Sequence, residues 1–243
     1  MLEIRHDKMD NFAATQEAYN VIYKNEGIQQ RDSFYLWILH LLNLKPGSLL
    51  LDISCGQGKL IKLAQTKGMH AIGVDFALEG VLVGKADSPA SQWLVGDGEC
   101  LPFDNGCIDY ITHIGSLEHY LNPQLGANEI FRTLKPGGKA AILLPNAFGL
   151  LGNIKYVMRT GEIFDDGQPI QRYATRAAWE RILTGAGLRV VRTIDYGEVE
   201  FPRTYRDALW FFCHPRKVLR YLLSILVPFN LTNHFVYICT RDR

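Results

Sequence analysis

Blocks of apolar and polar positions follow one another along the chain and predict strands and helices in turn. Short apolar runs, typical of strands buried on both faces, occur at 49–53, 70–74, 93–95, 107–114, 139–144, 188–194 and 235–240. Apolar residues at helical spacing predict helices at 59–67, 124–134 and 176–185. This alternation predicts an α/β fold, with a mostly parallel, doubly wound sheet that carries helices on both faces.

The N-terminal part, residues 10–43, predicts two helices separated by Gly27. The first is amphipathic and carries Tyr19 and Tyr23, whereas the second, over 34–42, is almost wholly apolar and is expected to be buried. Aromatic stripes usually pack into a core, and this is the favoured interpretation of the two tyrosines. The alternative is a lid whose aromatic faces touch a bound cation.

The length of 243 residues and the hydrophobic content of 47% predict one domain of 1–243. Within it we expect N-terminal helices over 1–48, a ligand-binding core over 49–145, and two less patterned segments, 146–173 and 196–233, that fold over the ligand end of the sheet. A helical lid is expected before the last strand. Its stretch 217–231 is apolar and flanked by basic residues, so it is either a lid helix buried on the domain, the favoured interpretation, or a helix lying on a membrane surface.

Charge and cysteine content exclude several classes of protein. Lys plus Arg at 26 against Asp plus Glu at 25 leaves no broad basic surface, so no nucleic-acid partner is expected. The five cysteines lack a C-x-x-C spacing, and no His, Asp or Glu cluster has the spacing of metal ligands, so neither a disulfide framework nor a metal is expected. The N-terminus lacks the apolar region of a signal peptide, and no apolar run reaches the ~18 residues of a membrane span. We therefore expect a cytoplasmic protein, peripheral to a membrane only if 217–231 binds one.

A glycine-containing loop follows the first buried strand and opens a helix. Asp52 lies in that strand, and Gly56 and Gly58 follow, which leaves bare backbone where a ligand can approach the main chain. A dinucleotide fingerprint that starts at Gly56 would need a third glycine where Ile61 stands. A carboxylate at the strand end repels a pyrophosphate and attracts an ammonium group, so the loop favours a zwitterionic or cationic ligand.

Two further carboxylates follow the next strands. Asp75 lies nineteen residues beyond Gly56, close to the offset of roughly 20 residues at which an acid accepts the ribose hydroxyls of a nucleoside ligand. The alternative is that Asp75 caps the next helix. Asp97 lies between two glycines and could accept from the exocyclic amine of an adenine, although Gly-Asp-Gly is also common turn chemistry.

The ordered set of motifs resembles the class I S-adenosylmethionine-dependent methyltransferases, specifically the methyltransferase type 11 group. The resemblance covers roughly 30–195 and rests on Leu51-Asp52-Ile53-Ser54-Cys55-Gly56-Gln57-Gly58, Val74-Asp75, 96–103, 104–110, Ser116-Leu117-Glu118-His119 and 134–138. It implies a seven-stranded, Rossmann-like sheet with its last strand antiparallel, and S-adenosylmethionine as cofactor with S-adenosylhomocysteine as product. The implied cofactor contacts are Asp52, Ser54, Gly56, Gly58, Asp75, Phe76, Asp97, Gly98, Glu99 and Ile114.

The sequence departs from the family pattern at Ser54, where most members have glycine. Three hypotheses follow. The main one is a methyltransferase acting by in-line displacement on O, N or C of a small-molecule, lipid-like or glycan acceptor. The second is a methyltransferase-like binding or scaffold protein without turnover, for which Ser54 is the support. The third is a nicotinamide-dependent oxidoreductase, which the missing third glycine opposes.

Methyl transfer requires positioning and, for a hydroxyl acceptor, a base that removes its proton. His119 is the candidate base because it follows the fourth strand at the ligand end of the sheet; a local structural role is an equally weighted alternative, and Glu118 is the second candidate. The predicted acceptor-side residues are Tyr19, Tyr23, Asn146, Tyr173 and Trp210. The sequence is compatible with a monomer or a homodimer.

Overall fold

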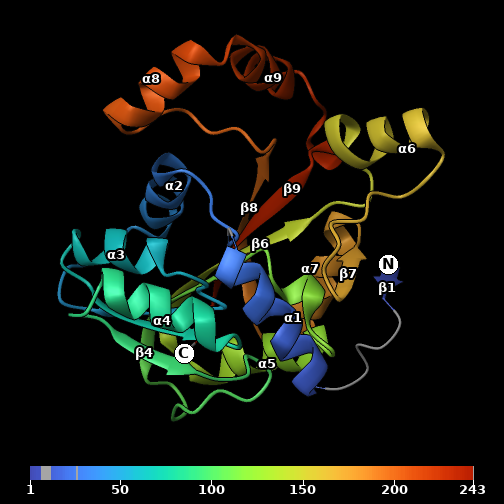
Figure 1. Cartoon of the computed structure of the whole chain (residues 1–243). Helices are drawn as coiled ribbons and strands as arrows, with labels where there is room; N and C mark the ends of the chain where they lie inside the picture. Colours follow the sequence, from blue (N-terminus) through green and yellow to red (C-terminus); the bar gives the residue numbers. More distant parts are fainter. Residues whose placement is uncertain (7–11, 26, 243) are drawn as a thin grey trace.

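The computed structural model describes residues 1–6, 12–25 and 27–242, and its centre is a seven-stranded sheet (Figure 1). The strands are β2 (Leu49–Ile53), β3 (His70–Asp75), β4 (Gln92–Val95), β5 (Ile108–Ile114), β6 (Leu134–Pro145), β8 (Arg189–Tyr196) and β9 (His234–Thr240). Their order is β4-β3-β2-β5-β6-β9-β8, and β9 runs antiparallel to its neighbours β6 and β8. The predicted fold class is confirmed, including the antiparallel last strand.

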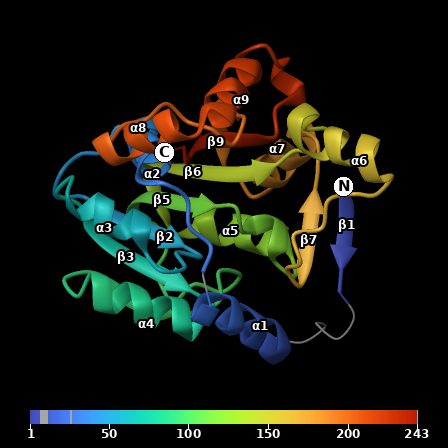
Figure 2. The same ribbon diagram turned by 45° about the horizontal axis from the view of Figure 1, so that its top comes forward.

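Helices cover both faces of the sheet (Figure 2). They are α1 (Phe12–Asn25), α2 (Asp32–Leu42), α3 (Lys59–Gln65), α4 (Leu78–Asp87), α5 (Pro123–Thr133) and α7 (Arg176–Gly185). One core packs α5 and α7 on the sheet around Trp179, whose side chain is fully buried. The other packs α2 and α3 on the opposite face around Phe34 and Ile38, as the apolar pattern over 34–42 predicts. Residues 10, 11 and 26 of the predicted helical segment 10–43 lie outside the described residues.

The strand register brings polar side chains to one edge of the sheet. β2 pairs in parallel with β3 and β5, so that Asp52 lies opposite Gly73 on one side and Thr112 on the other. Asp75 ends β3, and the loops after β4, β5 and β6 leave the sheet at the same edge. The carboxyl ends of parallel strands form the usual ligand-binding edge of such folds.

A second, two-stranded sheet was not predicted. β1 (Leu2–Arg5) and β7 (Ile170–Tyr173) pair antiparallel, with Leu2 opposite Tyr173. Both are four-residue strands that mix charged and apolar residues, so neither gives an apolar run that a sequence pattern would reveal. The side chain of Arg172 in β7 is buried and forms an ion pair with Glu3 in β1 at 2.7 Å.

The segment before β9 forms two helices, α8 (Tyr205–Cys213) and α9 (Pro215–Ile225), which stand at the top of the molecule in Figure 1. In the other less patterned segment, after β6, the short helix α6 (Lys155–Thr160) follows one irregular helical turn over Leu150–Ile154. The favoured interpretation of 217–231 as a lid helix buried on the domain is wrong, because none of the residues of α9 is buried. Within the described ranges, every helix is too short or too polar to cross a membrane.

Candidate functional site

A cavity of about 810 Å³ opens at the carboxyl ends of the strands. Binding sites for small molecules commonly occupy roughly 300 to 1,000 Å³, so this cavity has room for a cofactor and an acceptor side by side. Most of the predicted site residues line it: Tyr19, Tyr23, Asp52, Ser54, Gly56, Asp75, Phe76, Asp97, Gly98, Glu99, Ile114, Glu118, His119, Asn146 and Tyr173.

Two of the predicted site residues, Gly58 and Trp210, do not line the cavity. Gly58 is the N-cap of α3, and a Cβ atom at this position would lie 1.9 Å from the Trp93 ring, so glycine is needed there for packing. The indole of Trp210 is covered by the Arg31 guanidinium at 3.9 Å and stacks on His214 at 4.2 Å, so it is engaged outside the cavity.

The loop after β2 holds Ser54 in the left-handed region, with φ of 57°. This conformation costs a non-glycine residue roughly 1 to 2 kcal/mol, which is why glycine is common there. The hydroxyl of Ser54 lies 3.0 Å from that of Tyr120, and this hydrogen bond offsets part of the cost. The departure from the family pattern is therefore accommodated without disrupting the loop.

Asp75 ties the glycine loop to the next helix. Its Oδ2 accepts from the Gly56 N–H at 2.6 Å and its Oδ1 from the Ala77 N–H at 2.8 Å. Each oxygen keeps a second lone pair, which two ribose hydroxyls could use. The bond to Ala77 closes a turn before α4 (Leu78–Asp87), whose N-cap is Ala77 without a side-chain cap, so the interpretation of Asp75 as the helix cap is wrong. The side chain also faces the cavity, where it could accept hydrogen bonds from a nucleoside.

Asp52 and Asp75 are two buried carboxylates that repel one another. Burial raises the pKa of Asp52 to about 7, opposed by a hydrogen bond from Thr112 at 2.6 Å and reinforced by the charge of Asp75. Burial likewise raises the pKa of Asp75 to about 6, opposed by its two backbone hydrogen bonds. A cation in the cavity would favour the ionised form of both groups.

These shifts predict that a cationic ligand binds more tightly as the pH rises. A ligand with a sulfonium and an ammonium group should lose affinity below about pH 6, where both carboxyls hold a proton that binding must release. Calorimetric titration of S-adenosylmethionine should give an affinity about tenfold higher near pH 7.5 than near pH 5. S-adenosylhomocysteine, whose sulfur is neutral, is the matched control and should show a smaller change. Equal affinities of S-adenosylmethionine at both pH values would contradict the assignment.

The loop after β4 forms another wall of the cavity. Asp97 accepts from the Glu99 N–H at 2.8 Å, which holds the turn, and Glu99 accepts from the Asn122 N–H at 2.9 Å. A Cβ atom at Gly98 would lie 1.8 Å from the Tyr120 hydroxyl, so this ring packs directly on bare backbone. Asp97 is thus held at the edge of the cavity, where an adenine amine could reach it.

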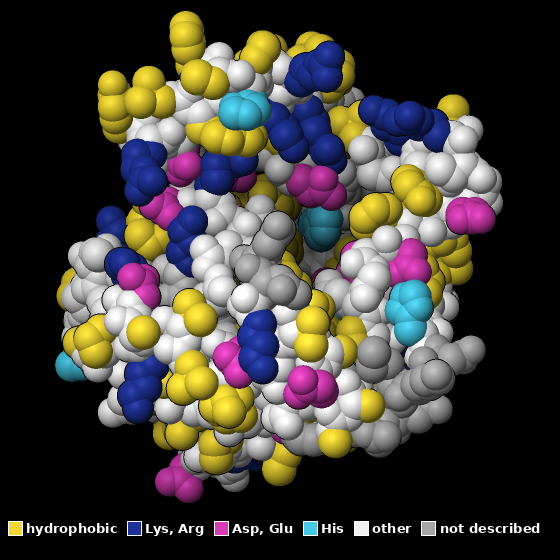
Figure 3. Space-filling view, viewed as in Figure 1, with side chains coloured by type: hydrophobic (Ala, Val, Ile, Leu, Met, Phe, Trp, Pro, Cys, Tyr) yellow, Lys and Arg dark blue, Asp and Glu magenta, His cyan; other side chains and the backbone are white. Residues whose placement is uncertain are grey.

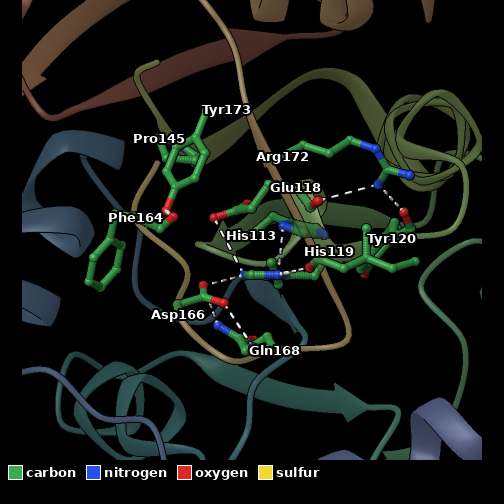
Figure 4. A network of polar contacts seen from close by, with 12 residues as sticks. His113, Glu118, His119, Tyr120, Pro145, Phe164, Asp166, Gln168, Arg172 and Tyr173 are labelled. Carbon is green, nitrogen blue, oxygen red and sulfur yellow. Dashed lines mark hydrogen bonds and ion pairs between the residues drawn. The ribbon is translucent and has the colours of Figure 1, made fainter. Parts of the chain in front are cut away.

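His119 lies in a short 3₁₀ turn (Leu117–His119) after β5, and its ring orientation is fixed. Its Nδ1 lies 2.5 Å from the Ile170 carbonyl oxygen, and because a carbonyl only accepts, Nδ1 carries the hydrogen. Nε2 is then an unprotonated acceptor, 3.9 Å from Glu118 Oε1 and 3.9 Å from Asp166 Oδ2 (Figure 4). Burial lowers the pKa of His119, with the charge of Asp166 opposing the shift, so the ring is neutral at pH 7.

Glu118 differs from His119 in its protonation. Burial raises its pKa to about 8, and the nearby charge of Asp166 adds to this shift, so the carboxyl holds a proton at neutral pH. Its Oε2 is buried and finds no hydrogen-bond partner among the residues that the structure describes. A protonated carboxyl is a poor base at pH 7, so of the two candidate bases the geometry and charge favour His119.

Residues of β7 and of the loop before it hold this turn in place. Arg172 donates to the carbonyl oxygens of Glu118 and Tyr120 from its Nη1 (Figure 4). The carboxylate of Asp166 accepts two hydrogen bonds from Gln168, one from the backbone N–H at 2.9 Å and one from the side-chain Nε2 at 2.9 Å. The unpredicted small sheet therefore supplies the carbonyl and the guanidinium that orient the candidate base.

Helix α1 closes one side of the cavity. The Tyr19 hydroxyl donates to Gln168 Oε1 at 3.1 Å, which connects α1 to the loop that carries Asp166. Tyr23 lies over the glycine loop, because a Cβ atom at Gly56 would be 2.9 Å from its hydroxyl. Both rings line the cavity instead of filling the core, which agrees with the lid interpretation of this helix.

Sequence reasoning missed Tyr120, Asp166, Gln171 and Arg172, which the structure brings to the cavity or to the turn that bears His119. Tyr120 follows the candidate base directly and could have been included on that ground. The other three lie in a segment without a motif. Among the described residues, no three His, Cys, Asp or Glu side chains gather in a way that could hold a metal ion.

Comparisons with known proteins identify the family of the domain that forms this cavity. Residues 51–142 match the family model described as a methyltransferase domain, Methyltransf_11. The chain carries a methyltransferase domain of the type 11 group. The resemblance to class I S-adenosylmethionine-dependent methyltransferases is confirmed, and S-adenosylmethionine is the cofactor of this class of domain.

The curated relatives match this chain at low sequence identity and over only part of its length. A demethylmenaquinone methyltransferase of Paenarthrobacter aurescens is 27% identical over 142 residues, 58% of this chain and 56% of that protein. A 2-phytyl-1,4-naphtoquinone methyltransferase of Synechocystis is 37% identical over 110 residues, 41% of this chain and 46% of that protein. The chain spans about half the length of these curated relatives.

Among solved structures, the geranyl diphosphate C-methyltransferase of Streptomyces coelicolor shares the fold. It superimposes with a TM-score of 0.64 at 14% identity and covers 93% of this chain and 98% of its own. It was solved with Mg²⁺, geranyl diphosphate and S-adenosyl-L-homocysteine bound. At this level of identity the likeness shows the fold alone.

Proposed function

We propose that this protein transfers the methyl group of S-adenosylmethionine to a small-molecule acceptor of the quinone type, with His119 as the base. The observation that carries the proposal is the position of His119: this residue, whose Nε2 is unprotonated, lines the same cavity as Asp75, the candidate ribose ligand. A base and a nucleoside site in one enclosed space are what methyl transfer to a hydroxyl-bearing acceptor requires.

The residues present fit the cofactor. Asp75 would accept the ribose hydroxyls, Asp97 would meet the adenine amine, and Asp52 would attract the ammonium group. When bound, the cofactor supplies a methyl group whose bond to sulfur breaks as the bond to the acceptor forms, the electron pair remaining on sulfur. The protein's part is to hold both partners in line and exclude water, which is worth on the order of 7 to 11 kcal/mol in well-oriented systems.

His119 would take the proton of an acceptor hydroxyl on Nε2. The imidazolium formed in this way would lie 3.9 Å from Asp166, whose negative charge stabilises it. The Ile170 carbonyl keeps its hydrogen bond to Nδ1 throughout, so the ring need not turn. Deprotonation would raise the electron density on the acceptor oxygen and on an attached aromatic ring, so the same base serves O- or C-methylation.

The acceptor side of the cavity favours an aromatic ring. Tyr156 and Phe164 pack edge to face with centroids 5.3 Å apart, and both line the cavity with Tyr173. In Figure 4, Phe164, Tyr173 and Pro145 lie on the same side of the His119 ring. The relatives named for demethylmenaquinone and 2-phytyl-1,4-naphtoquinone support a quinone-type acceptor.

The test is an assay with methyl-labelled S-adenosylmethionine against acceptors of different classes. We expect label in a prenylated hydroxynaphthoquinone in its reduced form, and none in a sugar, an ethanolamine phosphate or RNA. Label in a different small molecule would overturn the acceptor class but keep the activity. Binding of S-adenosylhomocysteine without transfer to any acceptor in a broad panel would support the scaffold hypothesis instead.

A further inference from the structure

Helix α9 turns its polar face toward the protein and its apolar face toward solvent, which is the reverse of a helix packed on a hydrophobic core. The side chains turned toward the body of the protein include Arg220, which pairs with Glu198, and Ser224, which packs against Gly197. The apolar side chains point to solvent: Leu222 is 54% exposed, Ile225 65% and Leu226, just after the helix, 79%. A helix in water would normally bury this stripe.

Helix α8 continues the same surface. Its Asp207 and Phe211 are buried, and Asp207 accepts from the Ser33 hydroxyl at 2.5 Å, which fixes which face of the helix is turned inward. The opposite face exposes Phe212 at 86% and Tyr205 at 78%. In Figure 3 hydrophobic side chains project from the top of the molecule, where α8 and α9 lie, with Lys and Arg side chains beside them.

The charged side chains of the segment that forms this surface, residues 201–231, are almost all basic. Residues 201–231 contain five of the 26 Lys and Arg of the chain but one of its 25 Asp and Glu, the buried Asp207. Arg203, Arg206, Arg216 and Lys217 are exposed. Exposed apolar side chains flanked by basic residues are typical of a surface that binds an anionic bilayer. The apolar side chains enter the interfacial region, and the basic side chains contact the lipid headgroups.

We propose that α8 and α9 dock this protein on an anionic lipid surface. A second copy of the chain fits this face less well, because a twofold contact would bring the same basic residues toward one another. The docked orientation also has a consequence for the cavity. Arg220 of α9 and its partner Glu198 line the cavity, so docking would place one wall of the cavity near the lipid and give an apolar acceptor a short path from the bilayer.

The experiment is co-sedimentation of the full chain with vesicles of phosphatidylcholine alone or mixed with phosphatidylglycerol. We expect binding to the mixed vesicles, weakened by added salt. The double variant Leu222→Glu/Leu226→Glu should reduce the partition coefficient by about tenfold or more. The matched control is Leu78→Glu/Leu82→Glu on α4, which changes two exposed leucines, also four residues apart, on a distant helix and should bind as the parent does.

Two results would overturn the proposal: no sedimentation with mixed vesicles, or equal sedimentation of the two double variants. A dimer in analytical ultracentrifugation that Leu222→Glu/Leu226→Glu dissociates, without vesicle binding, would assign the surface to a second copy instead. The shift in melting temperature with S-adenosylhomocysteine should be the same in every variant. This separates failure of docking from failure of the proposed methyl transfer.

Discussion

Replacing His119 with alanine is expected to lower kcat about 100- to 10,000-fold and to leave the Kd of S-adenosylmethionine nearly unchanged. The reason is that, in the proposed mechanism, His119 would take the proton of the acceptor on its unprotonated Nε2, whereas its hydrogen bond is to the Ile170 carbonyl, away from the residues assigned to the cofactor. The measurement is kcat with the best acceptor from the labelled-methyl assay, together with calorimetric titration of S-adenosylmethionine.

The matched control is His40→Ala, which removes an exposed imidazole from α2 and should keep full activity. The pH profile adds a second criterion. Because burial lowers the pKa of His119 below its usual 6.5, kcat of the parent should be flat around neutral pH and fall only in more acidic solution. Unchanged kcat in His119→Ala would assign this residue a structural role and require another base.

Replacing Asp75 with alanine should weaken S-adenosylmethionine binding about 100-fold or more. A hydrogen bond to a charged group contributes roughly 1.5 to 3 kcal/mol, and Asp75 is positioned to accept two from the ribose. The variant also leaves the Gly56 and Ala77 N–H groups without their acceptor, which loosens the glycine loop. Calorimetric titration measures the first effect and thermal unfolding the second.

Two variants complete this experiment. Asp75→Asn keeps one acceptor oxygen, so it should bind more tightly than Asp75→Ala and more weakly than the parent. Asp87→Ala removes an exposed carboxylate at the end of α4 that pairs with Lys62, and it should bind as the parent does. An affinity in Asp75→Ala equal to that of the parent would disprove the ribose assignment.

Local signals were sufficient to predict the sheet and the cofactor side of the cavity. Strands buried on both faces leave continuous apolar runs, as in Leu49–Ile53, and the end of such a run fixes where the next polar side chain emerges. This is why Asp75 and Asp97 could be placed at the edge of the cavity from sequence alone. Gly58 shows the limit of this reasoning, because its glycine is needed for packing against Trp93.

The acceptor side depends on contacts between distant parts of the chain. Asp166 and Ile170 contact His119 from the segment in which β7 pairs with β1 and Arg172 reaches back to the turn after β5. No motif marks these residues, since each interaction uses a backbone carbonyl or a single charge. The sequence over 217–231 predicted an apolar helix flanked by basic residues, but it could not tell which face is turned toward the protein, and in α9 it is the polar one.

The most direct test of the central claim is thermal unfolding with S-adenosylhomocysteine and, in parallel, with NAD. A ligand at about 100 times its Kd stabilises the native state by roughly 2.7 kcal/mol, which raises the melting temperature by about 5 to 10 °C in a chain of this size. We predict such a rise with S-adenosylhomocysteine, its loss in Asp75→Ala, and no rise with NAD. A rise with NAD and none with S-adenosylhomocysteine would contradict the assignment of this cavity to methyl transfer.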